Sequence, residues 1–79
     1  MEQKLVKRML KLEAAHTYYQ SKLENEISYF RECARTYDVE SIVTLLPLML
    51  QNIQDTRSYL KKLENQIQLL TFFMDDETL

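Results

Sequence analysis

Residues 42–74 of the chain read IVTLLPLMLQNIQDTRSYLKKLENQIQLLTFFM. Apolar side chains recur in this stretch at alternating intervals of four and three residues, with one interruption at Thr56. The recurring positions are Ile42, Leu46, Met49, Ile53, Leu60, Leu63, Ile67, Leu70 and Met74. This spacing is the a/d stripe of a heptad repeat, which lies along one face of an α-helix. The stripe therefore predicts a long helix that packs against a second helix.

The composition points to helices alone. The 79 residues include no glycine and one proline. Tight strand turns, phosphate-binding loops and nucleophile elbows depend on glycine, so its absence argues against sheets, nucleotide-binding loops and most enzyme scaffolds. The length allows one domain, near the smallest size at which a single core suffices. We expect an all-α fold with a single domain over residues 1–79.

A second, less regular stripe covers the first half of the chain. Its positions are Leu5, Met9, Leu12, His16, Tyr19, Leu23, Glu26, Phe30, Cys33 and Tyr37. We expect Ile27 to take the place of Glu26 in the buried face, because a 3.6-residue helix drifts against a 3.5-residue repeat. The two stripes together predict an antiparallel two-helix hairpin that resembles a coiled coil and is completed by oligomerisation or by a partner.

The expected boundaries follow from local signals. The first helix covers about 3–36, the turn about 37–40, the second helix about 41–74, and a frayed acidic tail 75–79. Asp38 is placed to cap the second helix, with Ser41 as an alternative cap. A reversal without glycine cannot be very tight, so we expect a connection of three to five residues. The numbers of facing residues are expected to sum to about 77, which places Lys22 beside Asp55.

Pro47 lies inside the second apolar stretch. A proline within a helix removes one hydrogen bond and costs about 3 kcal/mol. Two arrangements accommodate it: one helix that is kinked near Pro47, or a short helix followed by a separate long helix that begins near Leu46. The stripe crosses Pro47 without a change of phase, which favours the single kinked helix.

Few side chains are candidates for chemistry. His16 is the one histidine and Cys33 the one cysteine, whereas a metal site needs three or four ligands. We expect His16 to be a structural polar residue between helices and Cys33 to be a small buried residue near the turn. Glu13 and His16 have the Glu-x-x-His spacing of di-iron bundles, but the companion ligands are missing. We therefore expect no enzymatic activity, no cofactor and no metal.

Charge and hydropathy bear on partners and compartment. The formal net charge is −2, and the basic cluster Lys4, Lys7, Arg8 and Lys11 has acidic neighbours in the predicted hairpin. Neither nucleic acid nor a membrane surface is expected as a partner. The longest apolar run, 45–50, is too short for a membrane span, and the N-terminal residues lack the pattern of a secretory signal. We expect a cytoplasmic protein.

Apolar residues outside the two stripes are the candidate partner-binding residues. They gather towards the two ends of the hairpin: Val6, Leu10, Leu45, Leu48, Leu69, Phe72 and Phe73. Two helices cover one stripe each, so a lone hairpin has no third layer for these side chains. Two occupants remain open, a second copy in a four-helix bundle or a helix of a different protein. We expect a non-enzymatic protein–protein interaction module that acts as an adaptor, an assembly subunit or a small chaperone.

The stripe from Leu5 to Tyr37, the break at 36–38 and the stripe from Ile42 to Met74 also carry a resemblance in architecture. A small, glycine-poor helical hairpin with surplus apolar surface resembles the co-chaperones of type III secretion needle subunits. In that family a two-helix protein pairs with a larger helical-repeat chaperone, and together they hold the polymerising subunit monomeric. The resemblance implies a co-chaperone with a helical partner. A small homodimeric phage or bacterial regulator fits the same pattern.

Overall fold

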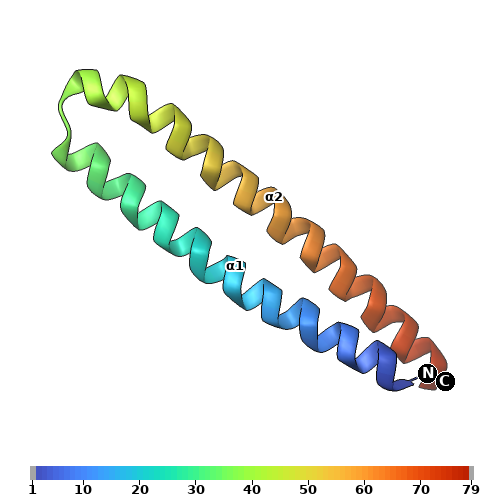
Figure 1. The fold of residues 1–79 in the computed structure, drawn as a ribbon. Coiled ribbons are helices and arrows are strands. Elements are labelled where there is room, and N and C mark those ends of the chain that lie inside the picture. The colour runs from blue at the N-terminus through green and yellow to red at the C-terminus, as the bar shows by residue number, and fades with distance from the viewer. Residues whose placement is uncertain (1, 79) are drawn as a thin grey trace.

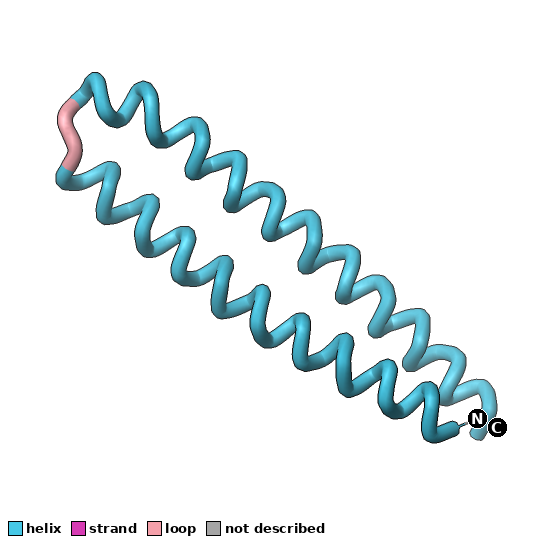
Figure 2. Tube along the Cα trace, in the orientation of Figure 1, coloured by secondary structure: helices cyan, strands magenta, loops and turns pink. Residues whose placement is uncertain are grey.

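The protein is an antiparallel helical hairpin. The computed structural model describes the backbone of residues 2–78 and the side chains of residues 3–75. It consists of α1 (Glu2–Thr36) and α2 (Val39–Thr78), and the described residues include no strand. The helices lie side by side along their length, with the turn at one end and both chain termini at the other (Figure 1), and only the turn is non-helical (Figure 2). The all-α hairpin predicted from the stripes is confirmed.

The core is a single seam made by the two heptad stripes. Stripe residues from Leu5 to Cys33 on α1 and from Ile42 to Met74 on α2 are buried or half-buried without exception. The most deeply buried apolar side chains are Cys33, Ile53, Leu60, Leu63 and Leu70. Because both stripes stay in contact over the whole length, each helix keeps the 3.5-residue repeat of a coiled coil. Tyr37, the expected last member of the first stripe, lies in the turn and is exposed instead.

The turn is shorter than predicted. Only Tyr37 and Asp38 separate the helices, whereas the sequence suggested 37–40 and a second helix from 41. The backbone N–H of Tyr37 donates to the carbonyl of Cys33 (3.0 Å), and that of Ile42 donates to the carbonyl of Asp38 (2.9 Å). Helical hydrogen bonds thus reach the turn from both sides. No residue from 2 to 78 has a positive φ, so this reversal does not require glycine.

Asp38 caps α2 as predicted. Its carboxylate Oδ1 accepts a hydrogen bond from the backbone N–H of Ser41 at 2.8 Å, which satisfies one of the N–H groups that have no partner inside the helix. This hydrogen bond lowers the pKa of the Asp38 carboxyl below its ordinary value, because it favours the charged form. The cap fixes where α2 begins.

α2 is one continuous helix through Pro47, so the arrangement with two separate helices is wrong. The proline ring leaves the carbonyl of Val43 without its helical partner. Pro47 is exposed, and Val43 is 68% exposed, so this turn of α2 lies on the solvent side of the helix. At the other end α2 includes residues 75–78, which were predicted as a tail; Leu79 lies outside the described residues.

The register of the two helices differs from the predicted one. Tyr19 contacts Tyr59, His16 contacts Glu64, and Glu26 contacts Thr56. In each pair the α2 residue lies one to five positions beyond a register whose numbers sum to 77. Two heptad stripes can pack only in registers that bring stripe positions together, and neighbouring registers of this kind differ by three or four residues. The observed register gives Glu26 a polar partner.

The same shift corrects two smaller predictions. Lys22 does not form an ion pair with Asp55: its Nζ lies 5.5 Å from the ring centroid of Tyr19, while Asp55 accepts a hydrogen bond from the Gln51 side chain at 2.9 Å. Ile27 does not displace Glu26 from the seam, since both are half-buried. The seam keeps Glu26 because the hydroxyl of Thr56 donates to its carboxylate at 2.6 Å.

Candidate interaction surface

The seam divides the surface of the hairpin into two long faces. Side chains one position before each stripe residue lie along one face, and those one position after lie along the other, because each stripe keeps to one side of its helix. We call the first the tyrosine face. On α1 it contains Lys4, Arg8, Lys11, Ala15, Tyr18, Lys22, Asn25, Tyr29 and Glu32, and on α2 it contains Leu45, Leu48, Asn52, Asp55, Tyr59, Lys62, Gln66, Leu69 and Phe73.

Aromatic contacts join the two helices in the middle of the tyrosine face. The rings of Tyr18 and Tyr19 lie 5.0 Å apart, and those of Tyr19 and Tyr59 lie 4.6 Å apart, both edge to face. The ammonium group of Lys22 adds a cation–π contact to the Tyr19 ring. Tyr18, Lys22 and Tyr59 thus meet around one ring, which places the α1 and α2 parts of the face on the same side of the molecule.

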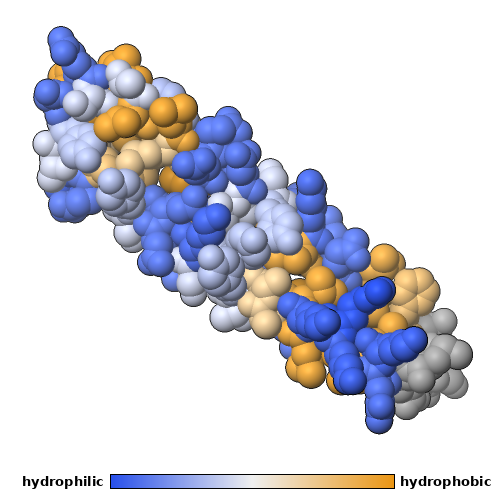
Figure 3. Space-filling view, viewed as in Figure 1, coloured by the Kyte–Doolittle hydropathy of each residue, from blue (hydrophilic) through white to orange (hydrophobic). Residues whose placement is uncertain are grey.

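The predicted partner-binding residues are all exposed, from 37% for Leu45 to 65% for Phe72. On the face drawn in Figure 3, apolar side chains gather towards both ends, next to hydrophilic ones, and the middle is mainly hydrophilic. The structure nevertheless does not bring the seven together. Leu45, Leu48, Leu69 and Phe73 belong to the tyrosine face, whereas Val6 and Leu10 lie on the opposite face and Phe72 lies on the back of α2.

The partner-binding residues predicted from the sequence include no tyrosine. Tyr18 and Tyr29 are 64% and 59% exposed, and Tyr59 is 43% exposed. The sequence does hold a signal for Tyr59. Like Leu45 and Leu48, it lies one residue before a position of the main stripe, on a line that has the same four-three spacing. Hydrogen bonding to Tyr37, and then to Cys33, raises the pKa of the Tyr29 hydroxyl, so this side chain stays uncharged well above neutral pH.

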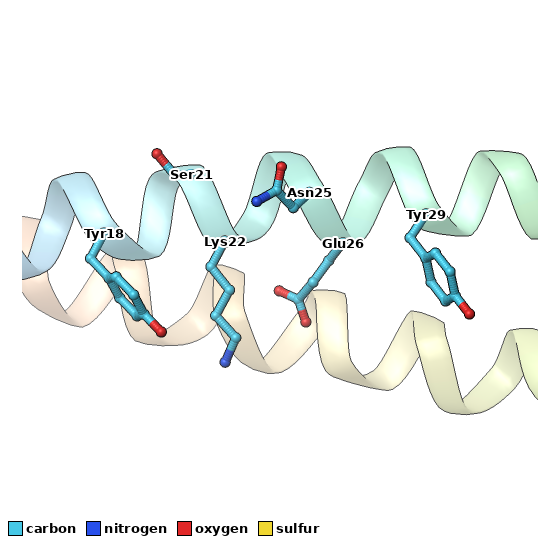
Figure 4. Close-up of a pocket in the computed structure, with 6 residues that line it drawn as sticks. All are labelled: Tyr18, Ser21, Lys22, Asn25, Glu26 and Tyr29. Carbon is cyan, nitrogen blue, oxygen red and sulfur yellow. The ribbon is translucent and has the colours of Figure 1, made fainter.

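A shallow depression of about 400 Å³ lies on the α1 side of this face. Figure 4 shows Tyr18, Lys22, Glu26 and Tyr29 extending towards α2, with Ser21 and Asn25 turned away. Pockets for small molecules are concave and enclose most of the ligand, whereas all six residues of this depression come from one helix. Its shape suits a side chain of another helix better than a small ligand.

Polar groups elsewhere form isolated contacts. On the opposite face His16 Nε2 lies 3.2 Å from Glu64 Oε1, which agrees with a polar residue between the helices. At the open end Lys4, Lys7, Arg8 and Lys11 line a second depression; residues 76 and 77, predicted as their acidic neighbours, lie outside the described side chains.

Among the described residues no group of three or more His, Cys, Asp or Glu is placed to hold a metal ion. In the same part of the chain, neither helix has the length and apolarity needed to cross a membrane.

Comparison with protein-family models, with curated proteins and with solved structures found no match for the chain. The resemblance to needle-subunit co-chaperones therefore stays a prediction from architecture.

Proposed function

We propose that the protein is a non-enzymatic interaction module that buries its tyrosine face against helices of a protein partner. The observation that carries this proposal is a second line of apolar side chains along α2, which has the same heptad spacing as the buried stripe. Leu45, Leu48, Tyr59, Leu69 and Phe73 are all exposed, and all lie one residue ahead of the buried stripe. A helix that packs against a single neighbour needs the a and d positions alone, whereas a helix in a bundle needs a wider apolar stripe.

The size of the face supports the same function. The Cα atoms of the hairpin extend over 59 × 15 × 14 Å, so one long face covers roughly 900 Å². A stable protein–protein interface buries about 800 Å² on each partner. A partner that covers the tyrosine face from end to end would bury an area of this size.

The proposal covers three roles: an adaptor, an assembly subunit and a small chaperone. A needle-subunit co-chaperone and a homodimeric regulator are two specific examples of such a module. It places this work in the cytoplasm, where a single cysteine stays reduced. The end residues would supply most of the binding energy, because apolar and aromatic side chains that become fully buried dominate helix association.

The test uses Leu69→Asp and Phe73→Asp, with Thr71→Asp as the matched control. Thr71 is exposed on the opposite face within the same turns of α2, so the control adds the same charge without touching the tyrosine face. We expect both face variants to lose assembly in sedimentation velocity and in affinity capture followed by intact-mass measurement. Helix content, followed by circular dichroism at 222 nm, should stay close to that of the unmodified chain. Unchanged assembly in both face variants contradicts the proposal.

A further inference from the structure

We propose that the partner on the tyrosine face is a second copy of this chain, packed end over end in an antiparallel four-helix bundle. This inference rests on the proposed function and adds the identity of the occupant. The twofold axis would lie in the interface between the two copies. It would run perpendicular to the helices and pass over the middle of both α1 and α2. Each helix would then lie on its own counterpart, α1 on α1 and α2 on α2, with the turn of one copy over the open end of the other.

The α2 side of the tyrosine face is complementary to itself when its two ends are exchanged. Its centre is Tyr59, and the intervals on both sides follow the same four-three spacing. A twofold axis at Tyr59 would place Leu48 on Leu69 and Leu45 on Phe73 of the second copy. It would also place Asp55 against Lys62 and would bring the two Tyr59 rings together. Apolar groups meet apolar groups and each charge meets its opposite, which an isologous interface requires.

The α1 side is complementary to itself in the same way. Here the axis falls midway between Tyr18 and Lys22. It would place Arg8 against Glu32 of the second copy, Lys22 against Tyr18, and Lys11 against Tyr29. The first is an ion pair, and the other two place an ammonium group on an aromatic ring, which is a favourable cation–π geometry. No like charges meet along this line.

The pattern on α1 and the pattern on α2 each define a centre of symmetry. The structure places these two centres at the same level along the hairpin. The α1 centre lies next to Tyr19, and the α2 centre is Tyr59. The rings of Tyr19 and Tyr59 are in contact, with centroids 4.6 Å apart. A single rigid twofold operation demands this coincidence.

Other arrangements of two copies bring together groups that repel each other or that are mismatched in polarity. The same operation on the opposite face brings Arg57 against Lys61 of the second copy, which are like charges. A twofold axis along the hairpin, with both turns at one end, would pack Arg8 and Lys11 onto Phe73 and Leu69. Arg8 would keep a cation–π partner in Phe73, but Lys11 would be buried against the aliphatic Leu69, and burying a cation without a polar or aromatic partner is unfavourable. The end-over-end pairing on the tyrosine face avoids both penalties.

A disulfide at the twofold axis tests the arrangement directly. We would make Tyr59→Cys in a Cys33→Ala background, with Arg57→Cys in the same background as the control on the opposite face. Under mild oxidation Tyr59→Cys should give a cross-linked dimer of twice the 9.5 kDa chain mass, while Arg57→Cys stays a monomer at the same concentration. Equal cross-linking of the two variants overturns the arrangement.

Charge exchange gives a second readout that leaves the aromatic centre intact. Asp55→Lys and Lys62→Asp, each alone, should weaken the dimer by about tenfold, because each creates two like-charge pairs per dimer. The double variant Asp55→Lys/Lys62→Asp should return the dimer dissociation constant to within about threefold of the original, and failure of this rescue overturns the pairing.

The outcome for the unmodified chain separates this inference from the proposed function. A monomer in sedimentation equilibrium at all accessible concentrations overturns the second-copy inference. In that case, capture of a different protein that Leu69→Asp abolishes and Thr71→Asp preserves would still support the interaction module. If neither self-association nor such capture occurs, both proposals are wrong.

Discussion

The polar contact inside the seam allows a quantitative test of the helix register. Thr56 is 6% exposed, and its hydroxyl lies 2.6 Å from a carboxylate oxygen of the half-buried Glu26. Hydrogen bonds to charged groups contribute about 1.5–3 kcal/mol. Water reaches part of Glu26, so we expect about half of this, on the order of 1 kcal/mol, as the coupling free energy between the two side chains.

A double-mutant cycle with Glu26→Leu and Thr56→Val measures this coupling. Thr56→Val alone should lower the free energy of unfolding by about 1 kcal/mol, because Glu26 stays partly buried without its donor. Glu26→Leu alone should change stability little, since the Thr56 hydroxyl keeps the carbonyl of Asn52 at 3.0 Å as an acceptor. The double variant should be as stable as the unmodified chain or more so, because both polar groups are gone.

The assay is urea denaturation followed at 222 nm, at one chain concentration for all four proteins. Residues that do not touch show additive effects to within about 0.5 kcal/mol. Additivity in this cycle would mean that Glu26 and Thr56 are apart. The helix register would then be wrong, and the centres of symmetry on α1 and α2 would not lie at the same level.

Three further predictions concern single positions. Asp38→Ala should lower the urea midpoint at pH 7 but much less at pH 2.5, because a carboxyl with a lowered pKa contributes stability above its unfolded-state pKa and loses it as the pH falls; an equal effect at both pH values contradicts the cap. Pro47→Ala should raise the free energy of unfolding by about 2 kcal/mol by restoring a hydrogen bond to the Val43 carbonyl; a decrease in a denaturation experiment would show that the proline ring packs favourably. Cys33 is 3% exposed, so its thiol should react with a maleimide at least about tenfold faster in urea than in buffer; similar rates would show that the turn end opens freely.

Both helices were predictable because each has a periodic signal that is repeated many times. One interruption, such as Thr56 or His16, does not change the phase of a stripe with nine or ten positions. The absence of glycine left no competing fold. Cys33 was predicted to be buried for the same reason, since it occupies a stripe position near the turn.

The turn and the register were not predictable in the same way. Each depends on a few residues and on free-energy differences between arrangements that lie one helical turn apart. Tyr37 and Asp38 complete the reversal because backbone hydrogen bonds and the Asp38 cap hold both helix ends. The stripe pattern predicts that Ile27 takes the place of Glu26 in the buried face. The structure pairs it with Thr56, and a search for matched polar positions in the two stripes would have found this register.

The candidate surface was partly predictable. Exposed leucines and phenylalanines at the two ends follow from simple counting of the residues outside the stripes. Their division between two faces does not, because it depends on how the second helix is placed beside the first. Val6 and Phe73 lie at the same end of the hairpin, yet the seam separates them. Tyr59 was missed because a tyrosine among charged residues resembles a solvated position until its contact with Tyr19 is known.

The polar middle of the tyrosine face has a role of its own in the proposed dimer. The apolar ends alone would tolerate a slip of the two copies by one heptad, since a leucine or phenylalanine would still cover part of the partner's surface. A slip in one direction would bring Lys62 against Lys62 of the second copy, and a slip in the other direction would bring Asp55 against Asp55. Either slip replaces two opposite-charge pairs by a like-charge pair at the axis, which is unfavourable. Polar positions in helical bundles commonly fix alignment at some cost in stability. In this hairpin the ends would supply affinity, and Asp55 and Lys62 would set the single alignment in which the two Tyr59 rings meet.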